Sequence, residues 1–156
     1  MMATIQYQTK VRRGIKLIAA VNGIAAILHL IFWILIFFLL PQPSALNVSA
    51  EKVDLMVTYG LGAADLLWAV PTLAIGSFWL RRQMLMGWLA AQMANILYCY
   101  SFTFILVRDL GAQSIRPGTL LFLPFALFSL WAAWYLWQVR AAFWNPRPMQ
   151  SNKRLR

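Results

Sequence analysis

Four long apolar runs are the feature that most constrains this chain. They cover roughly residues 15–40, 55–80, 85–107 and 119–143. At 1.5 Å per residue, a helix of about 20 residues crosses a hydrocarbon core of about 30 Å, and each run is at least that long. Unpaired backbone groups are too costly in lipid, and the runs lack the alternation of a membrane β-barrel. The sequence therefore predicts an all-α integral membrane protein with four transmembrane helices.

Composition and link lengths support one compact membrane domain. Of the 156 residues, 62% are hydrophobic and 12% are charged, too few charges to cover the surface of a soluble domain of this size. The Arg81-Arg82-Gln83 link is short enough to make the second and third helices antiparallel neighbours. We expect a single domain over residues 1–156. It consists of an up-down helix bundle and a basic tail at residues 144–156.

The basic residues predict the orientation of the bundle. Eleven of them fall on one side of the expected membrane, and the opposite side carries three basic and three acidic residues. This is the positive-inside pattern, so both termini are expected in the cytoplasm, in a multi-pass protein of the cell membrane, namely a bacterial inner membrane. We expect anionic lipid at these basic ends. Nucleic-acid binding is not expected, since no folded module remains to present a basic surface.

Small and polar residues form one stripe along each expected helix. In the second helix the stripe is Thr58, Gly62, Asp65, Ala69, Thr72 and Gly76, spaced by three or four residues. Such stripes face neighbouring helices, whereas the Leu, Ile, Phe and Val faces contact lipid. The polar members that we take as candidate site residues are Asn22, His29, Asp65, Gln92, Asn95, Cys99 and Ser129.

Asp65 stands within the apolar stretch GLGAADLLWAVP, near the middle of its helix. An Asp at a helix centre costs about 2.5–3.5 kcal/mol on insertion scales, so it should face inward and have a partner. His29 is the expected partner, in a midplane polar layer with Asn95 and Ser129. The pair is either ionic or a neutral imidazole beside a protonated acid, and both states stay open. Pro71 is expected to kink the helix and free a backbone carbonyl.

Three functions fit this pattern. The first is a non-enzymatic accessory, assembly or scaffold subunit whose buried polar layer fixes helix packing. The second is an oligomeric proton- or cation-coupled transporter or channel that uses Asp65 and His29. The third is binding of a lipophilic cofactor such as a quinone, pigment or haem, with His29 as one axial ligand. Small residues four apart, such as Ala19 and Gly23, suit a homo-oligomer or contact with other membrane subunits.

Cysteine and histidine counts limit the chemistry. One Cys and one His exclude an internal disulfide, a haem held by two His and a His-rich metal cluster within one chain. Cys99, His29 and Asp65 are the residue types of a nucleophile, a base and an orienting acid. No local motif surrounds them, so we assign no catalytic residue and no metal site. An enzyme is the least favoured of these functions, and the question stays open.

Overall fold

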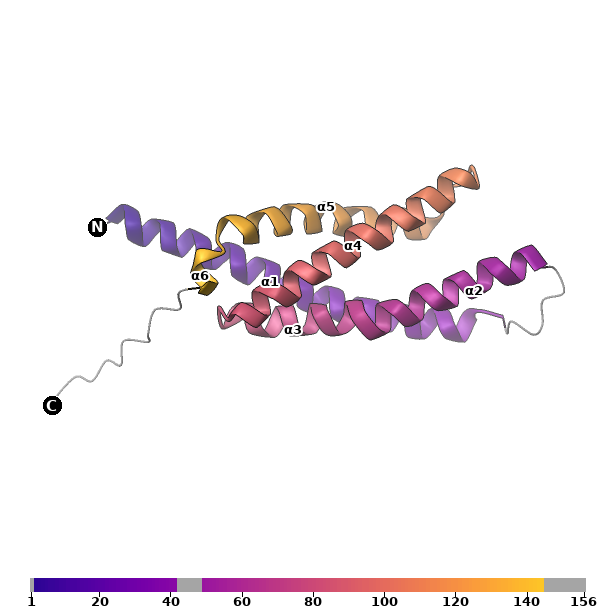
Figure 1. The fold of residues 1–156 in the computed structure, drawn as a ribbon, viewed down its shortest axis with the longest axis horizontal. Helices are drawn as coiled ribbons and strands as arrows, with labels where there is room; N and C mark the ends of the chain where they lie inside the picture. The colour runs from indigo at the N-terminus through magenta and orange to yellow at the C-terminus, as the bar shows by residue number, and fades with distance from the viewer. Residues whose placement is uncertain (1, 42–48, 145–156) are drawn as a thin grey trace.

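The computed structural model describes residues 2–41 and 49–144, and every element that these residues form is helical (Figure 1). Four helical stretches are long and apolar enough to cross a membrane: Thr9–Leu39, Lys52–Arg81, Leu85–Gly111 and Pro117–Gln138. The chain passes up and down the bundle between them. The full elements are α1 (Met2–Leu39), α2 (Ser49–Ala64), the π-helical turn η2 (Asp65–Ala69), α3 (Val70–Arg81), α4 (Leu85–Gly111), α5 (Pro117–Gln138) and α6 (Ala141–Trp144).

Helix α3 lies at the centre of the packing, because it contacts both α1 and α4, and α4 in turn packs on α5. Glycine allows the α3–α4 approach. A Cβ built on Gly76 would lie 3.1 Å from the backbone nitrogen of Ala91, and one on Gly87 would lie 2.3 Å from that of Leu80. Small residues let helix backbones approach closely where no water is present to drive association. The two glycines therefore fix how closely α3 and α4 pack.

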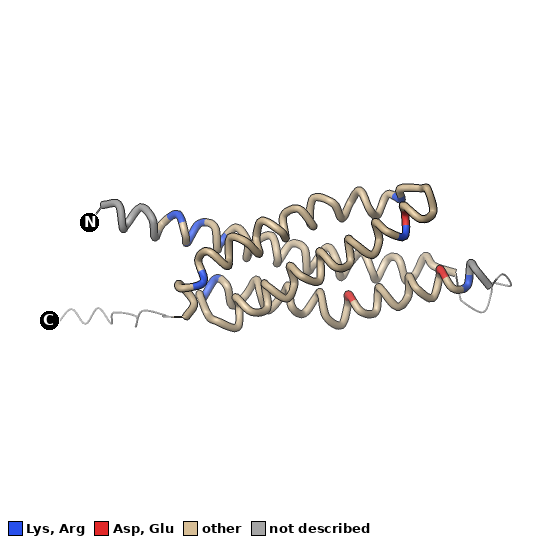
Figure 2. Tube along the Cα trace, turned by 45° about the horizontal axis from the view of Figure 1, so that its top comes forward, with Lys and Arg blue, Asp and Glu red and all other residues tan. Residues whose placement is uncertain are grey.

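Charged residues gather at the two ends of the bundle (Figure 2). We call the end where α1 begins and α3 meets α4 the basic end; its described cations are Lys10, Arg12, Arg13, Lys16, Arg81, Arg82 and Arg140. Toward the opposite end, the α4–α5 pair and the α1–α2 pair diverge in both views (Figures 1 and 2). Between the ends, the outward faces are Leu, Ile, Phe and Trp side chains.

The fourth long helix ends earlier than the sequence predicts. The apolar run suggested a helix to Phe143, but α5 stops at Gln138 and the short helix α6 follows. The Arg140 guanidinium donates to the carbonyl of Trp137 at 2.9 Å and so satisfies one of the helix-terminal acceptors. The turn folds α6 back, and Phe143, only 2% exposed, joins the core beside Trp88 and Leu136. Burial of one aromatic ring thus accompanies the break.

Candidate functional site: a buried cluster around Asp65

Four side chains from three parts of the bundle form a hydrogen-bonded cluster around Asp65. The carboxylate oxygen Oδ2 of Asp65 lies 3.1 Å from Nε2 of His29 and accepts a 2.9 Å hydrogen bond from the indole N–H of Trp33. The other imidazole nitrogen, Nδ1, lies 3.0 Å from the hydroxyl of Tyr98. Each of the four residues is at most 7% exposed. We call these residues, Trp33, His29, Asp65 and Tyr98, the Asp65 cluster.

Helix α5 closes the cluster with aromatic rings. Phe122 meets the His29 ring edge to face, with centroids 5.3 Å apart, and the Phe125 ring stacks with Tyr98 at 6.1 Å. Edge-to-face and offset pairs are the favoured geometries of aromatic rings. Since His29 and Trp33 come from α1, Asp65 from η2 and Tyr98 from α4, all four long helical stretches meet at this point. The cluster therefore forms only when all four long helical stretches are packed together.

The contacts limit where protons can sit. The indole of Trp33 is a donor only, so Oδ2 of Asp65 must act as an acceptor. If His29 carries two protons, it donates to both Asp65 and the Tyr98 oxygen, and the pair is ionic. If His29 is neutral with its proton on Nε2, Nε2–H donates to Asp65 and the Tyr98 hydroxyl donates to Nδ1, so a proton on Asp65 belongs on Oδ1. If the proton is on Nδ1, Nδ1–H donates to the Tyr98 oxygen, and Nε2 accepts from a protonated Oδ2. Among the described residues, Oδ1 accepts no hydrogen bond.

Both nitrogens of His29 are already used, which bears on the cofactor hypothesis. An axial haem ligand needs a free imidazole nitrogen for the iron. Here Nε2 faces Asp65 and Nδ1 faces Tyr98. Binding of a haem iron would have to break one of these contacts inside the bundle. The same occupancy leaves His29 without a nitrogen to activate Cys99, which lies half-buried beside Tyr98 on α4.

The π-helical turn η2 presents Asp65 to the bundle. The backbone N–H of Val70 bonds to the carbonyl of Asp65, a spacing of five residues. Pro71 follows and cannot donate a backbone hydrogen bond. The Thr72 hydroxyl donates to the carbonyls of Trp68 at 2.7 Å and Ala69 at 3.0 Å, which are not the carbonyls that Pro71 leaves without a donor. The widened turn thus lies just before Pro71 and has its own hydrogen bonds.

Beyond this turn the buried face of α3 includes residues next to the predicted stripe, Leu73 and Ser77. In an unbroken α-helix Thr72, seven residues after Asp65, would share its face. Instead Leu73 is buried at 2% exposure, and Thr72 is only partly covered. A π turn adds one residue to the helical turn, so the face after it is carried by the next residue along. Ala69 and Gly76 of the predicted stripe are buried, whereas Thr72 lies at the edge of the buried face.

Gly62 makes room for the indole of Trp33. A Cβ built on Gly62 would lie 2.5 Å from the Trp33 ring and 2.6 Å from the ring of Phe37. A heavy atom at that distance from a ring carbon forces the ring to move. Gly62 lies one turn before Asp65 and on the same face. A glycine in the helix therefore permits the hydrogen bond between Trp33 and Asp65.

The other candidate residues lie apart from the Asp65 cluster. Gln92 donates to the α5 carbonyl of Ala133 at 3.2 Å and accepts from Asn95 at 3.4 Å. Asn95, Asn22 and Ser129 are buried. Among the described residues, the Asn22 amide nitrogen has no hydrogen-bond partner. The structure thus brings His29 and Asp65 together but bonds neither of them to Asn95 or Ser129 within the described ranges.

A second buried carboxylate, Asp109, lies at the end of α4, outside the polar stripes that the sequence predicts. It is fully buried and accepts hydrogen bonds from the Thr119 hydroxyl, from the backbone N–H of Arg116 at 2.8 Å and from Arg108 at 3.0 Å. Arg116 also reaches Asp54 of α2 at 3.5 Å. In the sequence, the nearby cations Arg108 and Arg116 are the feature that could have indicated a paired carboxylate at Asp109. This network fixes the α4–α5 turn and links it to α2.

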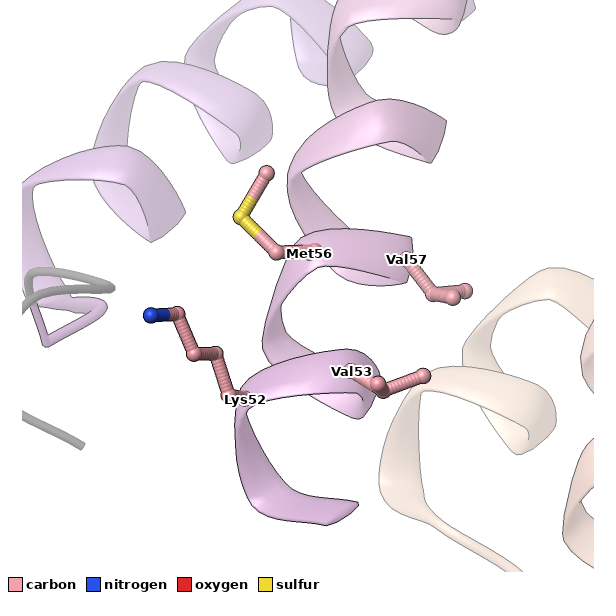
Figure 3. A pocket seen from close by; sticks show the side chains of 4 residues that line it. All are labelled: Lys52, Val53, Met56 and Val57. Carbon is pink, nitrogen blue, oxygen red and sulfur yellow. The ribbon is translucent and has the colours of Figure 1, made fainter. Parts of the chain in front are cut away.

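Figure 3 shows a hollow of about 550 Å³ on α2, lined by Lys52, Val53, Met56 and Val57. Lys52 and Met56 point to one side of the helix, and the two valines point to the other (Figure 3). The convergent polar groups of a small-molecule site are missing from this lining. Across residues 2–41 and 49–144, no three His, Cys, Asp or Glu side chains gather as a metal site would require. The Asp65 cluster is therefore the strongest candidate site.

Comparison of the chain with protein-family models, with curated proteins and with solved structures gave no match.

Proposed function

We propose that this chain is a multi-pass protein of a bacterial inner membrane, with both termini in the cytoplasm, that acts as a non-enzymatic scaffold or accessory subunit. Support for insertion comes from four apolar helices with outward Leu, Ile and Phe side chains. The concentration of cations at the basic end supports the orientation (Figure 2). Partners are other membrane subunits or further copies of the chain.

One observation carries the scaffold role: the Asp65 cluster joins all four long helices through groups that satisfy one another. Hydrogen bonds between membrane helices contribute about 0.6–2 kcal/mol each. They also penalise wrong arrangements, since a helix out of register leaves a carboxylate without donors in an apolar interior. The cluster thus selects one packing of the bundle, which a scaffold needs in order to present fixed lipid-facing surfaces to a partner.

Paired substitutions test this role. His29→Leu removes the partner of a buried carboxylate and should cost about 3–5 kcal/mol of unfolding free energy. In His29→Leu/Asp65→Leu no unpaired charge remains, so most of that loss should be recovered. Denaturant titration in mild detergent, followed by circular dichroism, measures both. Thr103→Val is the control, because Thr103 is exposed on α4 and bonds only to the Cys99 carbonyl. A double variant as unstable as His29→Leu would contradict the proposal.

Proton transfer is a second candidate, favoured by the unbroken contacts Asp65–His29–Tyr98 and by the unbonded Oδ1 of Asp65. These three titratable groups form a short path on which a proton can move. Asp65→Asn keeps the shape and an acceptor oxygen but cannot bind and release a proton. In reconstituted vesicles containing a pH-sensitive dye, a relay requires a proton flux that Asp65→Asn abolishes. If the wild type shows no proton flux, or if Asp65→Asn leaves the flux unaltered, proton transfer is excluded and the scaffold role remains.

A further inference from the structure

At the basic end, the fold brings three cations from two helices around one hollow. Arg12, Ile15 and Lys16 of α1, Arg81 at the end of α3 and Gln83 of the next turn line a space of about 200 Å³. Ile15 is 1% exposed and forms an apolar floor. The three cations are exposed around it. Arg12 and Lys16 are one helical turn apart, so they present their charges on the same face.

These cations have no anionic partner within the described part of the chain. The described carboxylates are engaged elsewhere: Asp65 with His29, Asp109 with Arg108, and Asp54 with Arg116. Like charges around one hollow repel one another, and an anion placed between them removes that repulsion. Arg is suited to bind phosphate oxygens through two parallel N–H donors, and Lys adds a point charge. The chemistry of the hollow therefore matches a phosphate group.

The turn places a neutral donor at the same hollow. Gln83 has φ 54°, a left-handed conformation that is uncommon for residues other than glycine. Its backbone N–H bonds to Leu80 at 2.9 Å, and the Met84 N–H bonds to Trp79 at 3.2 Å, so the turn is well fixed. Strained backbone positions often occur at ligand sites. Gln83 lines the hollow together with Arg81, and its side-chain amide is a neutral donor suited to a phosphate oxygen.

We propose that this hollow binds the phosphate of one anionic phospholipid, with phosphatidylglycerol as the probe. The proposal rests on the membrane insertion proposed above. An apolar floor favours a lipid over a free ion. On α1 an exposed apolar side chain continues from the hollow: Leu17, 51% exposed, follows Lys16. Acyl chains would cover such surfaces.

Two matched double variants test the site. Each variant removes two charges: Arg12→Gln/Arg81→Gln one from α1 and one from the end of α3, and Arg13→Gln/Arg82→Gln one from α1 and one from the turn after α3. The first pair lines the hollow, whereas Arg82 already lies over the Phe78 ring at 4.2 Å. Native mass spectrometry of the full chain, titrated with phosphatidylglycerol in mild detergent, should show one retained lipid. The first pair should weaken its binding about tenfold or more, since two charge-assisted contacts are lost, and the second by less than about twofold.

Three results would overturn the lipid site. Equal weakening by both pairs would indicate only diffuse attraction to the basic end. Equal retention of phosphatidylcholine would show that the negative headgroup is not recognised. A rise in melting temperature with inorganic phosphate that matches the rise with phosphatidylglycerol would assign the hollow to a free anion. The scaffold test measures the unfolding of variants at His29 and Asp65 without added lipid. Failure of the scaffold proposal is therefore distinguishable from failure of the lipid site.

Discussion

At the scale of single residues, the structure turns on how each polar side chain inside the bundle finds a partner. Oδ2 of Asp65 accepts from the indole of Trp33 and lies 3.1 Å from Nε2 of His29. Trp88 donates its indole N–H to the carbonyl of Leu136 at 2.9 Å, in the last turn of α5, where carbonyls lack intrahelical partners. Polar groups without water cost several kcal/mol unless they are paired. Among the described residues, the amide nitrogen of Asn22 departs from this rule.

Asn22→Leu is therefore expected to stabilise the protein. The Asn22 side chain is 3% exposed, and its amide nitrogen has no partner among the described residues. An unsatisfied buried donor costs about 1–3 kcal/mol, and Leu has nearly the same shape. Denaturant titration in detergent should show a gain of up to that size. Asn95→Leu is the matched comparison, because Asn95 donates to Gln92, and it should give no gain. A loss of stability in Asn22→Leu would show that the amide has a bound partner.

The sequence points to His29 as the partner of Asp65 because it is the one histidine in a chain with few charges. Its periodicity also puts Trp33 on the face of His29, four residues later, but does not mark the indole as a donor to Asp65, and it gives no sign for Tyr98. Eight Trp and five Tyr residues are spread over the chain, and their spacing is equally compatible with packing or lipid contact. What selects these two is the direction of one indole N–H and one hydroxyl. That depends on side-chain orientation across helices, which periodicity within one helix does not encode.

At the scale of elements, the ends of helices and the π turn carry most of the departures from expectation. Four helices follow from hydropathy alone, since each apolar run has one structural solution in lipid. The fourth helix was expected to continue to Phe143, because Val139 to Phe143 contains no proline or glycine. The break depends on the Arg140 side chain reaching the Trp137 carbonyl and on burial of Phe143. Both are tertiary effects that act on a sequence with helical propensity.

The short helix α6 offers a direct comparison of two neighbouring aromatic residues. Phe143→Ala empties a core position that is 2% exposed and should cost about 3–5 kcal/mol of unfolding free energy. Trp144 is 54% exposed and meets Trp88 edge to face at 5.1 Å, so Trp144→Ala should cost about 1 kcal/mol. Thermal unfolding of the full chain in mild detergent ranks the two variants. Equal melting temperatures would show that α6 does not dock on the bundle.

At the scale of the whole molecule, charge and shape divide the bundle into unlike ends. The basic end is closed by a tight turn and by α6, whereas the helix pairs diverge at the other end and are bridged by Arg116 and Asp54 (Figure 1). Composition predicted the distribution of charge along the chain. It did not predict the divergence, because that depends on which pairs of helices contain small residues at their crossing, as α3 and α4 do at Gly76 and Gly87.

Two turn residues provide a matched test of the proposed orientation. Gln83 and Gln113 occupy similar left-handed positions, φ 54° and 51°, at opposite ends of the bundle. In a Cys99→Ala background, Gln113→Cys should react with a membrane-impermeant maleimide in intact cells. Gln83→Cys should react only after the membrane is permeabilised, as the positive-inside rule requires. Labelling in the reverse order would place the termini outside.

The widened turn at Asp65–Ala69 sets the rotation of Asp65 relative to the half of the helix that follows it. If the same residues formed a regular α-helix, the side chains beyond the turn would rotate by about 100° relative to Asp65. Thr72 would then share the face of Asp65, and Leu73 would leave it. Loss of one residue from the turn would also give a regular helix, but Leu73 would then stand seven positions after Asp65 and keep its place on that face. A one-codon deletion within the turn should therefore disturb the bundle less than the same deletion elsewhere in the helix.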